Sequence, residues 1–309
     1  MSKRIVYYEH GAPEVLRWED ERVPEPSGGQ VLVRNELIGV NPIDWKLVAG
    51  VFESDPAPFP GTPGWASTGI IQAVGEGVSD FTIGQAVIVD SRARLPVTSG
   101  SRGGTFREYL AVDTRQLVLR PPEVSIVQAA GLPSSAVAGY SLIDHLRITE
   151  RDTLLIHGAA GNVGSAAVQI AVARGARVIG TASVANHDYL RSLGAHPVDY
   201  RADVVREVKD LGTITASADA VGGAASVAAT VSLLPEGGRA VTAWGDAHSR
   251  AAGIPWVSHP SDELHQVARL AAQGSLQVRI AEVLPLREAA TALERVKSGH
   301  AQGKILLRP

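Results

Sequence analysis

The sequence contains no cysteine among its 309 residues. This absence excludes disulfide bonds, thiolate zinc sites and a cysteine nucleophile. No apolar run is long enough to cross a bilayer, and no apolar segment follows the basic residues near the first methionine, so we expect neither a membrane-spanning helix nor a signal peptide. The formal net charge is -3 and no basic cluster is present, which argues against a nucleic-acid partner. We therefore expect a cytoplasmic protein that binds neither nucleic acid nor membrane.

The composition that remains is that of a soluble globular protein with two domains. Hydrophobic residues make up 45% of the chain and charged residues 20%, which is enough apolar material for a sizeable core. Up to about Pro122, short apolar runs alternate with turns that contain glycine or proline, as at 31–33, 69–74 and 86–89. Short strands with this punctuation are typical of an all-β, barrel-like unit.

The pattern changes after Pro122 to alternating strands and helices. A short apolar run at 153–157 suits a buried parallel strand, and residues 163–173 have helical spacing. A second strand is predicted at 177–181 and a second helix at 187–193. Strands and helices in this order are typical of a doubly wound parallel sheet. We also expect helices at 124–130, 136–146, 264–273 and 286–297, and strands at 216–221, 239–244 and 304–307.

The loop between the first of these strands and its helix reads His-Gly-Ala-Ala-Gly-Asn-Val-Gly over residues 157–164. This is the context that a dinucleotide-binding fingerprint requires, with Ala159 in place of the first glycine of G-x-G-x-x-G, followed by Gly161 and Gly164. Small residues let the backbone approach a pyrophosphate, and the helix N-terminus offers N–H groups and a positive dipole end. An ordinary tight turn is the alternative, but the strand–helix–strand context favours dinucleotide binding. The expected contacts are Ala159, Ala160, Gly161, Asn162, Val163 and Gly164.

The second strand indicates which dinucleotide is bound. It ends in Thr181-Ala-Ser183, with no carboxylate. An NAD-binding domain typically places Asp or Glu there for the ribose 2′-hydroxyl, and such a group would repel a 2′-phosphate. Ser183 can donate a hydrogen bond to that phosphate, whereas His187 and Arg191 are nearby cations that can equally belong to a solvated helix face. We therefore predict NADPH as the cofactor, with Thr181 and Ser183 among its contacts.

Several segments together resemble the zeta-crystallin-like quinone oxidoreductases, a zinc-independent group of the medium-chain dehydrogenase/reductase superfamily. The glycine loop with its helix, residues 157–171, carries the resemblance first. Further similar segments occur in the family's order and span nearly the whole chain, at 39–46, 104–109, 234–239 and 298–305.

The resemblance implies a two-domain fold and an assembly. Residues 1–122 and 263–309 are expected to form a GroES-like β-barrel catalytic domain, and residues 123–262 a Rossmann NADP-binding domain. In this family the active site lies in the cleft between the domains, and homodimers form through the Rossmann domain. We therefore expect a homodimer.

The resemblance also implies hydride transfer from NADPH to a quinone or α,β-unsaturated carbonyl without a metal. Zinc-dependent relatives place a cysteine near the position of Asn41 and His-Glu where this chain has Trp65 and Ala66, which cannot bind zinc. Tyr200 matches a tyrosine that contacts the 2′-phosphate, although a tyrosine packed at a strand end is the alternative. The segment Trp244-Gly245 matches the backbone that meets the nicotinamide, and Val221, at another predicted strand end, is added to the cofactor contacts.

Reduction of a carbonyl-bearing acceptor places negative charge on its oxygen, which needs hydrogen-bond donors. Asn41 matches an active-site asparagine near the nicotinamide, and its amide and the Lys46 ammonium are our candidate catalytic groups. The proton can come from Lys46 or from water; a surface ion pair between Asp44 and Lys46 is the alternative. His157 ends a buried strand, and we expect it to be a hydrogen-bonded core histidine.

Departures from the family pattern leave other functions open. Lys46 stands where many members have tyrosine, Ala66 where aspartate is frequent and Ala138 where threonine is common. A nucleotide-binding protein with little turnover and an enoyl-thioester reductase of a biosynthetic pathway therefore remain as alternatives. A short-chain dehydrogenase is excluded, because no tyrosine is followed by lysine four residues later.

Overall fold

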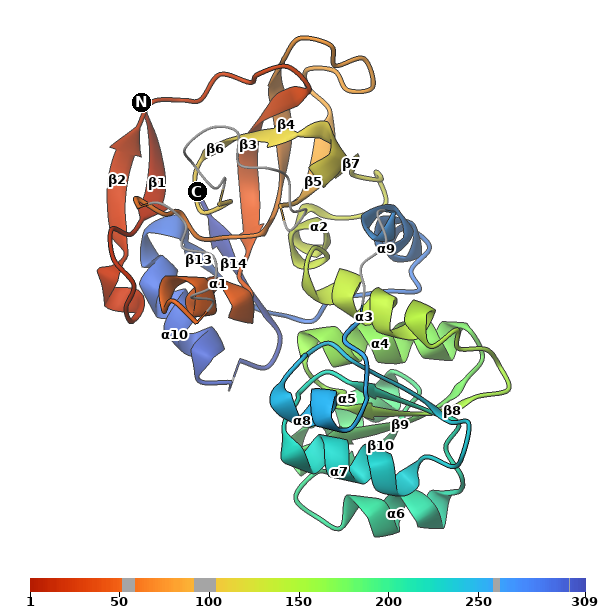
Figure 1. Cartoon of the computed structure of the whole chain (residues 1–309). Helices are drawn as coiled ribbons and strands as arrows, with labels where there is room; N and C mark the ends of the chain where they lie inside the picture. Colours follow the sequence, from red (N-terminus) through yellow and green to blue (C-terminus); the bar gives the residue numbers. More distant parts are fainter. Residues whose placement is uncertain (52–58, 92–103, 258–261, 300) are drawn as a thin grey trace. The chain divides into compact units, whose positions relative to one another are not determined.

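The computed structural model describes residues 1–51, 59–91, 104–257, 262–299 and 301–309. The chain divides into two compact units (Figure 1), the first formed by Met1–Ser134 with Arg279–Pro309 and the second by Ser135–Val278. His300, part of the similar segment 298–305, lies outside the described residues.

A seven-stranded sheet forms the frame of the first unit. Its order is β13-β14-β3-β4-β5-β7, with β6 paired to β3. All neighbours are antiparallel except β13 and β14, which run parallel. In the register of β14 on β3, Leu307 lies opposite Ile38, so the last strand of the chain completes a sheet begun near its start. The strands are β3 (Gln30–Gly39), β4 (Ala66–Val74), β5 (Ala86–Asp90), β6 (Tyr109–Asp113), β7 (Leu117–Leu119), β13 (Ile280–Pro285) and β14 (Lys304–Arg308).

Among the described residues, a two-stranded sheet and three α-helices complete this unit. The two strands, β1 (Ser2–Val6) and β2 (Arg17–Glu21), are antiparallel. The helices are α1 (Pro42–Val48), α2 (Ile126–Gly131) and α10 (Ala289–Lys297). Helix α2 packs on β3, β4 and β14, which is why it belongs here although the sequence suggested a boundary at Pro122.

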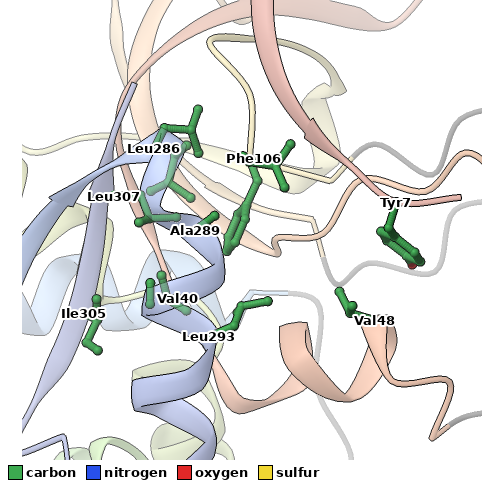
Figure 2. Close-up of a cluster of buried hydrophobic side chains, with 12 residues drawn as sticks. Tyr7, Val40, Val48, Phe106, Leu286, Ala289, Leu293, Ile305 and Leu307 are labelled. Atoms are coloured by element: carbon green, nitrogen blue, oxygen red, sulfur yellow. The ribbon is translucent and has the colours of Figure 1, made fainter. Parts of the chain in front are cut away.

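One apolar core of this unit holds α1 in place. Figure 2 shows side chains from α1, α10 and β14 that belong to one buried cluster with Phe106, which is fully buried. Val48 of α1 and Leu293 of α10 contribute to it, and Trp45 packs against its edge. Burying such side chains contributes roughly 1.5–3 kcal/mol each. The core therefore fixes the helix that carries two of the predicted functional residues.

The second unit is a parallel sheet with helices, as the sequence predicted. The strand order is β10-β9-β8-β11-β12, and every neighbouring pair is parallel. From β8 the chain adds β9 and β10 on one side of the sheet and then β11 and β12 on the other. The point between β8 and β11 is therefore the switch point, where such sheets bind ligands at their carboxyl edge. The strands are β8 (Thr153–His157), β9 (Arg177–Ala182), β10 (His196–Asp199), β11 (Ala216–Asp219) and β12 (Arg239–Thr242).

The helices of this unit include several that were not predicted from the sequence, namely α6, α7 and α8. Helix α9 packs on α3, and the buried Glu263 accepts a hydrogen bond from Ser141, so residues 263–278 belong to this unit and not to the first. The α-helices are α3 (Ser135–His145), α4 (Asn162–Ala173), α5 (His187–Ser192), α6 (Val204–Leu211), α7 (Ala224–Leu233), α8 (Ala247–Ala251) and α9 (Glu263–Ala272). None of the described helices is both long and apolar enough to cross a membrane.

Candidate functional site

The glycine loop after β8 is tied closely to its neighbours. Gly158 has a φ of +67°, and a Cβ there would lie 2.2 Å from Cγ2 of Val221, so only glycine fits. Its N–H donates to Oγ1 of Thr181 at 3.1 Å, and the N–H of Ala159 donates to the Thr181 carbonyl at 3.0 Å. Thr181 is buried, so it shapes the loop from β9.

The first turn of α4 continues this loop and forms a cradle of backbone groups. A Cβ on Gly164 would lie 2.2 Å from the Gly158 carbonyl oxygen, so the helix rests directly on the loop. A Cβ on Gly161, the N-cap, would meet nothing nearer than that oxygen at 3.4 Å, so its surface is open. The amides of Asn162 and Val163, in the first turn, have no acceptor within the helix. Open backbone donors at the positive end of a helix suit a pyrophosphate. The half-buried Ala160 completes the loop.

A second loop lies across the switch point, after β11. One carboxylate oxygen of Asp219 accepts from the N–H groups of Val221 and Gly222, both at 2.9 Å. The other accepts from Oγ of Ser226 at 3.1 Å. A Cβ on Gly222 would lie 2.3 Å from the indole of Trp244, which follows β12. This loop leaves Val221 58% exposed at the carboxyl edge of the sheet. Gly245 follows Trp244 and lies against Trp256.

A third group lies at the ends of β9 and β10, which are neighbours in the sheet. The N–H of Tyr200 donates to the Ala182 carbonyl at 3.3 Å, which places Tyr200 beside the segment that ends in Ser183. The Arg201 guanidinium lies 5.3 Å from the Tyr200 ring centroid, and its Nε donates to the tyrosine hydroxyl at 3.2 Å. Tyr200 is 54% exposed, so it is not a packed core tyrosine. Arg201 was not selected from the sequence, although it stands next to Tyr200.

The two other cations considered near this edge differ in their surroundings. Arg191 forms an ion pair with Asp188 at 2.7 Å on the exposed face of α5. This is the alternative in which Arg191 belongs to a solvated helix face. His187 begins that helix, and its Nε2 is buried without a hydrogen-bond partner among the described residues. Arg201 is therefore the better placed arginine for a 2′-phosphate.

His157 lies beneath the glycine loop and is the core histidine that we predicted. Its Nε2 lies 3.1 Å from Oγ1 of Thr230, which in turn lies 2.9 Å from Oγ of Ser217. Burial lowers the pKa of His157, which favours the neutral ring. The residue supports β8, and its contacts with the described residues are those of a structural histidine.

In the first unit, Asn41 is the N-cap of α1. Its backbone N–H donates to Oδ2 of Asp44 at 2.8 Å, and its side chain accepts from the Asp44 N–H, a reciprocal capping box. Its Nδ2 donates to the Gly39 carbonyl at 3.2 Å, and its Oδ1 accepts from Nζ of Lys304. The carboxamide is 1% exposed and held at both ends. Asp44 is thus a buried cap, and the surface ion pair considered for Asp44 and Lys46 is wrong.

Asp44 and Lys304 are fully buried ionisable groups, so each is shifted toward its neutral form. Burial raises the pKa of Asp44, against the attraction of Lys304. Burial lowers the pKa of Lys304, against the attraction of Asp44 and Asp90. The sequence predicted Lys304 only as part of a strand.

Lys46 lies on the same helix as the Asn41 cap. Its Nζ is 5.6 Å from the ring centroid of Trp45, and Nζ of Lys297, at the end of α10, is 5.7 Å from the same centroid. Burial lowers the pKa of the half-buried Lys46 to about 8. A pKa near the working pH suits a proton donor.

The predicted residues thus form two groups, one in each unit. Asn41 and Lys46 lie on α1 of the first unit, and the predicted cofactor contacts lie on loops at the carboxyl edge of the parallel sheet in the second. Among the described residues, no three His, Asp or Glu side chains are grouped as a metal site would require.

Comparisons with known proteins agree with this architecture. Residues 27–122 match the model of the alcohol dehydrogenase GroES-like domain, and residues 193–307 match that of a zinc-binding dehydrogenase. The quinone oxidoreductase of Sus scrofa is 30% identical over 99% of this chain and 98% of its own length. The NADPH-dependent alkenal/one oxidoreductase, chloroplastic, of Arabidopsis thaliana is 28% identical over 99% of this chain and 79% of its own length. Among solved structures, the quinone oxidoreductase from Coxiella burnetii has a TM-score of 0.88 at 26% identity, covering 100% of this chain and 99% of that one.

Proposed function

Because the chain belongs to the medium-chain dehydrogenase/reductase family, in its quinone oxidoreductase type, we propose that it is an NADPH-dependent reductase of quinones or α,β-unsaturated carbonyls. The cradle formed by Gly158, Gly161 and the first turn of α4 carries this proposal, because its open backbone donors fit a dinucleotide pyrophosphate. Relatives that are named quinone oxidoreductase and NADPH-dependent alkenal/one oxidoreductase support the acceptor class and the choice of NADPH.

The cofactor would be held by loops at the carboxyl edge of the parallel sheet in the second unit. The amides of Asn162 and Val163 would bind the pyrophosphate, and the loops that carry Val221 and Trp244 would flank the nucleotide on the other side of the switch point. Ser183, with Tyr200 and Arg201, would bind the 2′-phosphate, where a hydroxyl and a guanidinium replace the carboxylate of an NAD site. When bound, NADPH supplies the hydride.

The first unit would supply the groups that stabilise and protonate the reduced acceptor. The Asn41 amide is a donor to the oxygen on which charge develops, and the Lys46 ammonium is the proton source. Neither role needs a metal ion. We further propose that the protein is a cytoplasmic homodimer, for which light scattering should give twice the chain mass of 32.4 kDa.

The role of Lys46 predicts a pH dependence. Lys46 can donate a proton only as the ammonium, and its pKa is lowered to about 8, so turnover with saturating substrates should fall as the pH rises above about 8. A Lys46→Met variant should lose about 10²-fold in turnover at neutral pH and lose this alkaline limb. Steady-state rates from pH 6 to 10 measure both effects.

Lys297→Met is the matched control, because Lys297 contacts the same Trp45 ring. It should retain the wild-type pH profile. An alkaline limb that persists in Lys46→Met would assign the titration to another group.

The Arg201 guanidinium predicts cofactor preference. An Arg201→Ala variant should raise KM for NADPH about 10- to 100-fold, because a hydrogen bond to a charged group contributes roughly 1.5–3 kcal/mol. KM for NADH should not change, since NADH lacks the 2′-phosphate. Kinetics with both cofactors test this, with Arg206→Ala, on the exposed part of α6, as the control. An equal rise in KM for NADPH and for NADH would show that Arg201 stabilises the fold and does not select the cofactor.

Turnover assays test the function itself. We expect saturable NADPH oxidation with 1,4-benzoquinone, 9,10-phenanthrenequinone or a simple enone, unaffected by a chelator. Turnover confined to an enoyl thioester would instead indicate the alternative function, an enoyl-thioester reductase of a biosynthetic pathway. Tight NADPH binding measured by fluorescence, with no turnover on any acceptor, would refute the reductase proposal.

A further inference from the structure

Lys304 is an ammonium group buried inside the first unit. It begins β14, where the following Ile305, Leu306 and Leu307 are fully buried, and its own exposure is 0%. Lysine is almost never fully buried without a specific partner, because removing its charge from water is costly. Here the ammonium donates to the carboxamide oxygen of Asn41.

The fold does not need this contact for the helix cap. The N-cap of α1 is already satisfied by the reciprocal hydrogen bonds between Asn41 and Asp44. What Lys304 adds is a second donor on Oδ1 of Asn41, opposite the end where Nδ2 donates to Gly39. A flipped amide would turn its NH₂ group toward the Lys304 ammonium and the Asp44 N–H, so the flip is disfavoured.

We propose that Lys304 is a positioning residue that holds the Asn41 carboxamide with its oxygen inward and its amino group as the donor for the reaction. A donor on the oxygen also polarises the amide and strengthens its N–H groups as donors. The catalytic part of this inference rests on the proposed function, whereas the contact between the two side chains does not.

Two carboxyl groups face the ammonium and influence its protonation. They are Asp44, on α1, and Asp90, at the end of β5, whose Oδ2 lies 3.4 Å from the Ser134 nitrogen. Their attraction opposes the burial that lowers the Lys304 pKa. Burial outweighs this attraction, so the pKa of Lys304 lies below that of an exposed lysine.

Selective isotope labelling can test the contact in the intact protein, since the chain has only four asparagines and five lysines. In wild type labelled at Asn Cγ and Lys Cε, the Asn41 carbonyl signal should move with the same midpoint as the Lys304 signal when the pH is raised. Asn41→Asp and Lys304→Met identify the two signals by their loss. An Asn41 signal that stays constant while Lys304 titrates would overturn the contact. The titration itself is measured on wild type, and the two variants serve only to assign the signals.

Kinetics then test the positioning role. Lys304→Met should lower kcat about 10- to 100-fold with KM for NADPH nearly unchanged, as expected when a reacting donor is slightly misplaced. Lys304→Arg should restore part of kcat and the Asn41 signal, and Lys209→Met, an exposed lysine on α6, should match wild type. A Lys304→Met protein with wild-type kcat but a shifted Asn41 signal would overturn the positioning role. Wild type without any turnover would refute the proposed function and with it that role, while the labelling result would still decide the contact.

Discussion

A Gly164→Ala variant is expected to lose NADPH binding by more than about 100-fold and to unfold at a lower temperature. The new Cβ would lie 2.2 Å from the Gly158 carbonyl oxygen, a backbone atom that can move only if the whole loop shifts. Overpacking of this kind typically costs about 1–3 kcal/mol. Alanine in a helix would otherwise stabilise by about 1 kcal/mol relative to glycine, so a lower melting temperature can only come from the contact. Thermal unfolding and fluorescence titration with NADPH measure the two effects.

Gly161→Ala is the matched control, because the same methyl group is added three residues earlier. There it would meet the Gly158 oxygen at 3.4 Å, an ordinary contact, so the melting temperature should stay close to wild type. NADPH binding should still weaken, because the methyl group would occupy the surface on which the pyrophosphate is expected. If Gly161→Ala binds NADPH normally, the cradle is not the cofactor site, whatever happens at Gly164.

The fold of the second unit was readable from the sequence where local pattern and burial agree. The run at 153–157 and the helix after it were predicted almost at their observed bounds, since an apolar run, small residues and helical spacing succeed one another there. Strand β10 was not predicted, because it has four residues, includes Pro197 and pairs only with β9. Residues 263–278 were assigned to the catalytic domain, but the contact of α9 with α3 is between segments far apart in sequence and has no local signal.

The candidate site shows even more clearly that contacts between residues far apart in sequence leave no local signal. Asn41 and the glycine loop stood out because short motifs carry them. The partner of Asn41 could not be seen, because Lys304 is 263 residues away and a lysine at a strand start is ordinarily assumed to face water. Arg201 was visible beside Tyr200, but only the contact between the two side chains distinguishes it from the arginine at position 191, which pairs with Asp188.

An Asn41→Asp variant is expected to lose about 10²- to 10³-fold in kcat while keeping its fold. The new carboxylate can accept from the Asp44 N–H and from Lys304 as the amide oxygen does, so the cap and the buried contact persist. It cannot donate, and its charge would repel the oxygen on which negative charge develops, so the donor is lost; removal of one such donor typically costs this factor. Steady-state kinetics should show KM for NADPH nearly unchanged, and a deuterated NADPH should show a larger isotope effect because hydride transfer becomes slower.

Comparison with Asn41→Ala separates catalysis from stability. Alanine removes the cap, which costs about 1 kcal/mol, and leaves Lys304 without its acceptor. Asn41→Asp should therefore melt at a higher temperature than Asn41→Ala, and the opposite charge beside Lys304 should raise the pKa of that lysine. If Asn41 mattered only as a cap, Asn41→Asp would be the more active of the two variants. If Asn41 is the donor, Asn41→Asp should be more stable than Asn41→Ala but no more active. This comparison of stability with activity can be made with any acceptor that the enzyme reduces.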